Sequence, residues 1–258
     1  MRFGVCCAPD QTAALADVPL DYVEWPVAST VGAMDDAAFR GLARDAARLP
    51  FRPEVWNVLL PQVLMLVGPA ADHEGLRRYA GRTLPRLRAL GGEVVVLGSG
   101  LCRAVPEGWP RAEAETQFGL ACRILAEEAD RRGLTIALEP LNRRETNLVT
   151  TLGDAVRVVA LIDAAAFRVL ADLYHMAAED EPFAAVRTAA PVLAHVHVAA
   201  PITRTVPGDA EAVAALRSFL GELAAAGYDR RISLECVWKE PEEIARGLAA
   251  TKAAWRPV

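Results

Sequence analysis

The sequence predicts an α/β protein built as one closed (β/α)8 barrel, a TIM barrel, that forms a single domain over residues 1–258. Three observations lead to this prediction. Eight short runs of β-forming residues alternate with longer segments of helical periodicity that are rich in Ala, Leu and Arg. The length of 258 residues suits one such barrel, which typically needs about 250 residues. No Gly/Ser-rich linker, low-complexity tract or further repeat divides the chain.

The β-type runs follow one another with a regular spacing. Most of them begin 25 to 41 residues apart, which leaves room for one crossover helix between successive strands. The first crossover, over 9–19, is shorter than the others and is the least well defined element. The expected strands cover residues 3–8, 20–24, 53–59, 93–98, 134–139, 167–172, 192–197 and 231–236.

Local signals mark where several helices begin and end. Pro110 suits the first turn of a helix and Gly133 suits a C-terminal cap, so a helix is expected between them. Thr151 and Asp154 have the spacing of a capping box at the start of the next helix. Gly227 is expected to end the helix that precedes the last strand.

Composition and charge exclude several classes of protein. Hydrophobic residues make up 53% of the chain and charged residues 24%, which excludes a disordered or collagen-like protein. The net charge of -5 provides no broad cationic field for a phosphate backbone or an anionic membrane. We therefore expect a small-molecule partner rather than nucleic acid or a membrane, and a homo-oligomer is compatible with this composition.

The N-terminus and the cysteines indicate a cytoplasmic protein. Arg2, Asp10 and Asp17 surround a short apolar run that is too brief and too charged for a signal peptide or a membrane span. The cysteines are odd in number and lack CxxC spacing, which is typical of reduced thiols that pack in a core. They are Cys6, Cys7, Cys102, Cys122 and Cys236.

Four successive strands end in an ionisable residue. Glu139, Asp172, His197 and Glu235 occupy the ends of the expected fifth to eighth strands. Active sites of such barrels lie at the C-terminal ends of the strands, so these side chains are expected to converge on one mouth. Three carboxylates and an imidazole in one place repel strongly unless a cation neutralises them. A buried hydrogen-bond network is the alternative.

The residue types narrow the choice of cation. Three carboxylate oxygens and one imidazole nitrogen suit a divalent ion such as Mn²⁺, Mg²⁺ or Co²⁺, and they lack the thiolates of a structural zinc site. Mn²⁺ is the expected ion. Coordination positions are expected to remain free for water or substrate.

Further polar residues follow the same strand ends in the sequence. Glu145 and Arg143 follow the fifth strand, His175 lies one turn beyond the sixth, and Arg204 lies in the loop after the seventh. As loop residues they are placed to reach over the mouth and contact a polyhydroxylated ligand, although surface ion pairs are the simpler alternative. His195 lies two residues before His197, on the same strand face but deeper, and is expected to support that site.

The opposite wall of the mouth has its own candidates. Glu24 and Asn57, on the second and third strands, either line this wall or make structural hydrogen bonds. Aromatic residues near strand ends either form an apolar part of the wall or pack in the core. They are Trp25, Trp56, Trp109 and Trp238.

Given these residues, the chain resembles the xylose-isomerase-like TIM barrels of the sugar phosphate isomerase/epimerase family. That family includes ketose 3-epimerases, hydroxypyruvate isomerases and inosose-processing enzymes. The resemblance spans the whole chain and is most specific over 133–238. There the segments ALEPLNRRE, LADLYHM, AHVHVAA with the following RTVPG, and ISLE occur in the order and spacing typical of the family.

The resemblance implies roles for individual residues. Glu139, Asp172, His197 and Glu235 match the metal ligands. Among these, Glu139 and Glu235 match the two acid/base carboxylates. The substrate-binding positions of the family match Glu145, His175 and Arg204.

The expected reaction is proton transfer next to a carbonyl group. A small sugar, ketose or hydroxy-keto acid would bind the ion through two neighbouring oxygens, so that an enediolate forms when a carbon-bound proton is removed. One of Glu139 and Glu235 would remove the proton and the other would return one. Reprotonation of the same carbon gives epimerisation, and reprotonation of the neighbouring carbon gives isomerisation; the sequence does not distinguish them.

Two other functions use the same residues. A lyase or dehydratase similar to inosose-processing enzymes would expel a hydroxyl group from the same intermediate. A non-catalytic sugar- or metal-binding subunit would hold a ligand without proton exchange. Whether the substrate is phosphorylated stays open, because Arg103, Arg143 and Arg144 either hold a phosphate or neutralise neighbouring acids.

Overall fold

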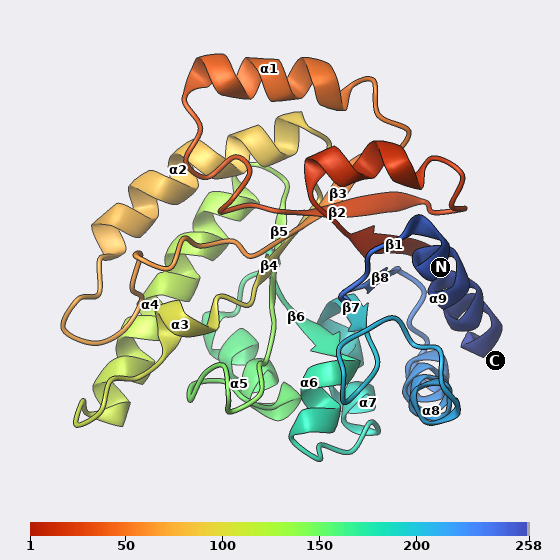
Figure 1. The fold of residues 1–258 in the computed structure, drawn as a ribbon. Helices are drawn as coiled ribbons and strands as arrows, with labels where there is room; N and C mark the ends of the chain where they lie inside the picture. Colours follow the sequence, from red (N-terminus) through yellow and green to blue (C-terminus); the bar gives the residue numbers. More distant parts are fainter. Residues whose placement is uncertain (257–258) are drawn as a thin grey trace.

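The computed structural model describes residues 1–256 and contains a closed barrel of eight parallel strands in sequence order (Figure 1). Strand β8 closes the barrel by pairing with β1, where Arg2 lies opposite Arg231. The predicted fold class is confirmed, and every expected strand is present. The strands are β1 (Arg2–Cys6), β2 (Tyr22–Pro26), β3 (Pro53–Asn57), β4 (Val94–Leu97), β5 (Thr135–Leu138), β6 (Phe167–Asp172), β7 (Leu193–Val198) and β8 (Arg231–Leu234).

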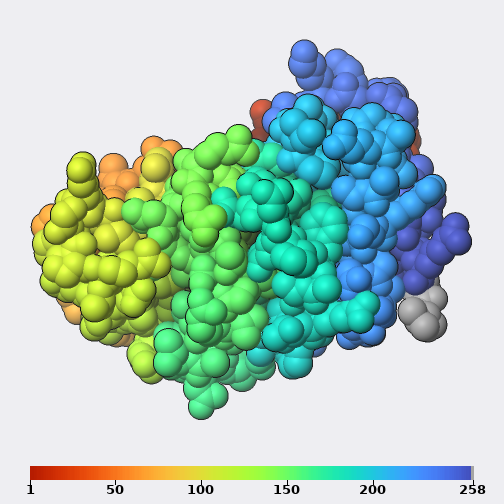
Figure 2. All heavy atoms as spheres, turned by 90° about the horizontal axis from the view of Figure 1, so that it is seen from below, coloured from red at the N-terminus to blue at the C-terminus, as the bar shows by residue number. Residues whose placement is uncertain are grey.

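Helices connect the strands and cover the outside of the barrel. Seen from below, the surface colours follow the sequence from the yellow segment through green to blue, because successive crossovers lie beside one another (Figure 2). The helices are α1 (Asp36–Ala46), α2 (His73–Ala89), α3 (Gly100–Arg103), α4 (Arg111–Asp130), α5 (Leu152–Ile162), α6 (Leu173–Ala178), α7 (Ala185–Ala189), α8 (Ala210–Ala225) and α9 (Pro241–Ala254), with 3-10 helices η1 (Pro9–Leu15) and η2 (Ala190–Val192).

The first crossover contains the 3-10 helix η1 in place of an α-helix. The segment between β1 and β2 is too short for a long helix that packs along the barrel. Thr12 and Leu15 are buried in this turn, and Thr12 Oγ1 accepts a hydrogen bond of 3.0 Å from the indole of Trp25. The short crossover is therefore attached to β2 by a side-chain contact.

The helix caps agree with the sequence signals. Thr151 Oγ1 accepts a hydrogen bond of 3.1 Å from the backbone NH of Asp154, and Asp154 Oδ2 accepts one of 3.1 Å from the NH of Thr151. This is the predicted capping box at the start of α5. Gly133 and Gly227 follow α4 and α8 with φ of +62° and +72°, a conformation that favours glycine.

The core has two parts. The larger part lies between the barrel and its helices. The smaller part fills the barrel interior; Tyr22, Ala137 and Leu170 in it each lie two residues before a polar strand-end residue, so they point to the same side, one step deeper. This apolar layer, which lies beneath the polar mouth, consists of Tyr22, Val55, Val94, Val96, Ala137, Leu170 and Ala194.

Two expectations about membrane contact and thiols are also addressed by the structure. Within residues 1–256, no helix has the length and the apolar character that crossing a bilayer requires. The cysteines are free thiols, as predicted, with Cys6 and Cys236 partly exposed and the others buried.

Candidate metal centre

Four side chains from the ends of β5, β6, β7 and β8 meet at one mouth of the barrel. Glu139 directly follows β5, Asp172 ends β6, His197 lies in β7 and Glu235 directly follows β8. Each residue offers one ligand atom, and these four atoms all lie within 4.8 Å of one another. The structure therefore brings together the four residues that the sequence analysis selected.

His197 lies at the centre of this four-residue cluster. Its Nδ1 atom is 3.0 Å from Glu139 Oε1, 3.5 Å from Glu235 Oε2 and 3.7 Å from Asp172 Oδ2. No more than 15% of any of the four side chains is exposed. Three carboxylates in so dry a space repel one another unless positive charge lies among them.

The pKa values of the two glutamates reflect this crowding. Burial and the neighbouring charge of Glu235 raise the pKa of Glu139 above its ordinary value. Burial also disfavours the ionised form of Glu235, but His197 and Arg204 outweigh burial and lower the pKa of Glu235. The two carboxylates therefore differ in environment although they lie in the same cluster.

Glu24 of β2 fixes the orientation of His197 from the other side. Its Oε1 lies 2.9 Å from His197 Nε2, and its Oε2 lies 3.0 Å from His195 Nε2. Glu24 is fully buried, and although burial disfavours its charge, the two histidines hold its pKa well below the usual range. His197 Nε2 therefore carries a proton toward Glu24. Although burial disfavours a charged ring, Glu24 and Glu235 raise the pKa of His197 well above its ordinary value, so without a cation Nδ1 is protonated as well.

A buried hydrogen-bonded chain continues beneath Glu24. His195 Nε2 also lies 3.2 Å from Ser233 Oγ, which in turn lies 2.9 Å from the hydroxyl of Tyr22. Of the two residues considered for the opposite wall, Glu24 makes structural hydrogen bonds, whereas Asn57 Nδ2 donates to Glu235 Oε1 over 3.4 Å at the mouth. The contact between Glu24 and His197 was not predicted, although the position of Glu24 at the end of β2 was a signal.

Arg204 spans the outer side of the cluster. It donates to Glu235 Oε2 over 2.7 Å and to Glu145 Oε1 over 3.4 Å. Its guanidinium also lies 4.9 Å from the centre of the Tyr174 ring. Arg204 has φ of +52°, so the loop after β7 is held in an uncommon conformation that directs this side chain to the mouth.

The expectation that His175 is a loop residue is wrong. It lies in the first turn of α6, because Asp172 caps this helix and accepts a hydrogen bond of 3.1 Å from the backbone NH of His175. His175 Nδ1 accepts a hydrogen bond of 3.1 Å from the backbone NH of Asn142, so Nε2 carries the ring proton. Nε2 is buried and has no partner within residues 1–256, which makes it an available donor.

The cluster opens into a cavity of ≈ 460 Å³. We call it the C-terminal cavity, because it lies at the C-terminal ends of the strands. Glu139, Glu145, Arg204 and Glu235 line it, so charged groups occupy one part of its wall. This size and mixture of polar and apolar groups suit a small molecule. The apolar part of the wall includes Val58, Leu60, Leu101 and Leu141.

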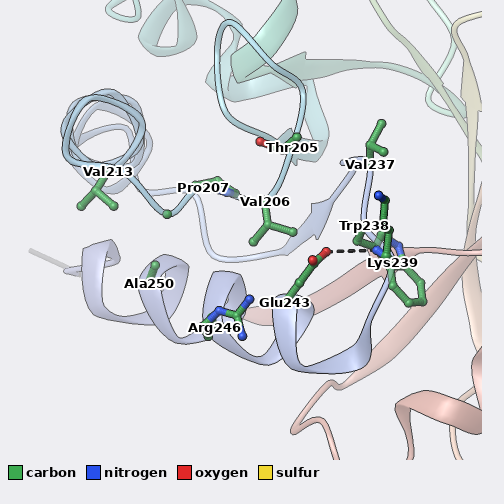
Figure 3. A pocket seen from close by; sticks show the side chains of 11 residues that line it. Thr205, Val206, Pro207, Val213, Val237, Trp238, Lys239, Glu243, Arg246 and Ala250 are labelled. Carbon is green, nitrogen blue, oxygen red and sulfur yellow. Dashed lines mark hydrogen bonds between the residues drawn. The ribbon is translucent and has the colours of Figure 1, made fainter.

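No tryptophan lines the C-terminal cavity over residues 1–256, so of the two alternatives left open for these residues the structure favours packing elsewhere. Trp25 and Trp56 are adjacent in sequence to Glu24 and Asn57, and neighbouring strand residues point to opposite sides. They are fully buried outside the barrel, with ring centres 5.6 Å apart. Trp238 instead lines a separate cavity of ≈ 520 Å³ between the loop after β7 and α9 (Figure 3).

The three arginines considered for phosphate binding have different environments. Arg103 is fully buried and donates to the backbone carbonyls of Leu97 and Glu139, so it supports the end of β5 and is not available to a ligand. Arg143 forms an ion pair with Glu179. Arg144 alone of the three lines the C-terminal cavity.

Gly98 allows the close approach of Glu139. A Cβ atom at position 98 would lie 2.4 Å from Glu139 Oε2, which is shorter than any allowed contact. Gly98 was not predicted to take part in the site, because this contact joins the end of β4 to the end of β5 through space. Only a residue without a side chain leaves the carboxylate where it is.

Comparison with known proteins places this barrel among enzymes of one fold family. A family model described as xylose isomerase-like TIM barrel matches residues 12–254. The chain belongs to this family. The resemblance found in the sequence is thereby confirmed.

Two curated relatives of this family member are epimerases by name. A 3-dehydro-D-guloside 4-epimerase of Escherichia coli (strain K12) is 32% identical over 125 residues, which cover 46% of this chain and 48% of the relative. A D-psicose 3-epimerase of Agrobacterium fabrum is 34% identical over 85 residues, which cover 33% of this chain and 29% of the relative. The matched segments therefore span less than half the length of either relative.

Solved structures of the family resemble the chain over nearly its whole length. D-Psicose 3-epimerase from Clostridium cellulolyticum H10, with D-tagatose, has a TM-score of 0.83 and 20% identity, covering 98% of this chain and 99% of that chain. A 3-keto-D-glucoside 4-epimerase from E. coli has a TM-score of 0.76 and 21% identity with the same coverage. At these identities the likeness demonstrates a shared fold.

Proposed function

We propose that the chain is a divalent-metal-dependent isomerase or epimerase that acts on a small sugar, ketose or hydroxy-keto acid. One observation carries the proposal: a nitrogen of His197 and one carboxylate oxygen from each of three acidic residues all lie within 4.8 Å of one another. The relatives named as sugar epimerases support the same class of reaction. Glu139, Asp172, His197 and Glu235 would hold the ion.

The residues fit a metal ion by their chemistry as well as their spacing. Glu24 accepts the Nε2 proton of His197, and this carboxylate–histidine arrangement is typical of metal-binding histidines. The three carboxylates suit Mn²⁺, with Mg²⁺ and Co²⁺ as close alternatives. When bound, the ion supplies positive charge beside a substrate carbonyl and makes the neighbouring C–H more acidic.

Glu139 and Glu235 would move the proton. They come from β5 and β8, which are not neighbours in the barrel, so the two carboxylates approach the cavity from different sides. One removes a carbon-bound proton and the other returns a proton, to the same carbon in an epimerase or to the next carbon in an isomerase. Asn57 and Arg204 hold Glu235 in position through the contacts described above.

Three other groups would bind the sugar hydroxyls. His175 Nε2 is a buried donor that has no partner among the described residues, and Glu145 and Arg204 line the C-terminal cavity. Burying the His175 donor without a partner costs free energy that a substrate oxygen recovers. Binding energy of this kind orients the reacting carbon between Glu139 and Glu235.

The test combines metal analysis with hydrogen exchange. The purified protein is assayed for bound metal and then incubated in heavy water with ketoses and hydroxypyruvate. We expect about one divalent ion per chain and deuterium at a carbon next to a carbonyl. Glu235→Gln should abolish exchange, whereas the control Arg217→Gln, on the exposed surface of α8, should retain it. Full activity of Glu235→Gln would refute the assigned role, and loss of water from the product would identify a dehydratase.

A further inference from the structure

A second polar cavity lies at the opposite mouth of the barrel. It has a volume of ≈ 490 Å³ and is lined by residues at the N-terminal ends of β4 to β8. Arginine dominates its charged residues. These are Arg88, Arg168, Arg230, Arg231 and Glu93. We call it the arginine cavity.

The arginine cavity shares two strands with the candidate metal centre. Arg168 lies four residues before Asp172 in β6, and Arg231 lies four residues before Glu235 at β8. An even separation directs both members of each pair to the same side of the strand. Four residues span about 13 Å, so the arginines lie inside the barrel at the mouth opposite the carboxylates.

An apolar layer separates the two mouths. Val94 and Ala194 line the arginine cavity and also belong to the buried layer inside the barrel. Tyr22, Ala137 and Leu170 of the same layer lie directly beneath the polar residues of the metal centre. A ligand in the arginine cavity would therefore not touch the four-residue cluster.

Most of the positive charge in the arginine cavity is not compensated. Arg231 is paired with Glu93 and, over 3.1 Å, with Glu54. Among residues 1–256, Arg88, Arg168 and Arg230 have no carboxylate oxygen within 4.0 Å of their guanidinium nitrogens. Arg88 donates to the backbone carbonyl of Gly92 over 3.1 Å. Arg88 and Arg230 are exposed and Arg168 is half-buried, so water screens their repulsion, and an anion that binds among them gains charge-assisted contacts with several guanidinium groups.

We propose that the arginine cavity is a binding site for a phosphate group, either as inorganic phosphate or as part of a small phosphorylated molecule. The three unpaired arginines come from α2, β6 and the segment before β8, so they surround the cavity from different elements. A phosphate dianion offers several oxygens to such a set, whereas a single carboxylate offers two oxygens and one charge. This site goes beyond the proposed function and does not depend on it.

Calorimetric titration with inorganic phosphate tests the proposal. The full chain is first treated with a chelator, so that phosphate cannot bind through a metal ion at the other mouth. We expect saturable binding of about one phosphate per chain. Arg168→Gln and Arg230→Gln should each weaken binding by about tenfold or more, because each removes a charge-assisted hydrogen bond.

Matched variants distinguish the arginine cavity from phosphate binding elsewhere on the molecule. Arg217→Gln makes the same charge change at an exposed residue of α8, and this variant should bind phosphate like the wild type. Glu235→Gln should also leave phosphate binding unchanged. Arg230 is exposed and precedes β8, so its variant remains informative if Arg168→Gln fails to fold. Absence of saturable binding, or binding that survives Arg230→Gln, would overturn the proposal, and tighter binding of malonate than of phosphate would overturn the assignment to phosphate.

Discussion

At the scale of single residues, Glu24 shows how one carboxylate sets the chemistry of another side chain. It contacts both His195 and His197, and none of these three residues lines the C-terminal cavity. Its partners are separated from it by 171 and 173 residues. The strand-end positions of Glu139, Asp172 and His197 are visible in the sequence, but a pairing across the barrel depends on closure and register, which a single sequence does not specify.

Replacing Glu24 by Gln should weaken metal binding. The amide keeps the size of the side chain but no longer offers two carboxylate oxygens to the histidines, so His197 loses the partner that fixes its tautomer. We expect affinity for Mn²⁺ to fall by about 10- to 100-fold. Calorimetric titration with Mn²⁺ measures this. Thr116→Ala, at an exposed residue of α4, serves as the control. An unchanged affinity for Mn²⁺ in Glu24→Gln would contradict the role assigned to Glu24.

Replacing Gly98 by Ala should reduce activity with little loss of stability. The added methyl group would lie 2.4 Å from Glu139 Oε2 and would displace this carboxylate. A displacement on the order of 1 Å costs about 100-fold in rate, so kcat/KM should fall by that order. Gly119→Ala provides the comparison, because a methyl group there meets nothing within 4 Å. Equal kcat/KM values for the two variants would show that Gly98 does not position Glu139.

At the scale of elements, strand ends and caps were more predictable than crossovers. The strand runs and the Thr151 capping box depend on local sequence, and the structure contains them. The first crossover depends on packing, which is not a local signal, whereas the cap that Asp172 forms for α6 is local but was not recognised, because Asp172 was considered only as a strand-end residue. Asp172 thus takes part both in the start of a helix and in the cluster at the mouth.

Removing the cap of α5 should lower stability. Thr151→Ala removes the oxygen that accepts a hydrogen bond from Asp154. We expect the free energy of unfolding to fall by about 1 kcal/mol, the usual effect of losing an N-cap. Urea denaturation measures this change, and Thr151→Ser should retain most of the stability. If Ala and Ser variants were equally stable, the cap would contribute nothing measurable.

At the scale of the whole molecule, a bound metal should stabilise the fold. The three carboxylates around His197 repel one another without an ion, and an ion that binds only the folded chain stabilises it by an amount that rises with the logarithm of the ion concentration above Kd. At a concentration of about 100 times Kd, Mn²⁺ should add about 2.7 kcal/mol. Thermal unfolding with Mn²⁺ and with a chelator measures the difference.

A matched variant shows whether this stabilisation arises at the cluster. Asp172→Asn removes one charge and one strong ligand, so the difference in Tm between Mn²⁺ and chelator should become smaller. Arg217→Gln changes an exposed residue of α8 and should show the full wild-type difference in Tm. An unchanged difference in Asp172→Asn would mean that the ion binds elsewhere on the molecule.

The pairs Arg168–Asp172 and Arg231–Glu235 make both mouths depend on the same alternation of side chains. A point substitution alters one end of β6 or β8 and leaves the other unchanged. Insertion or deletion of one residue between the members of a pair would instead turn one of them outward. We therefore expect a change of length between the two ends to disturb both mouths, whereas a substitution at one end disturbs only the mouth where it lies.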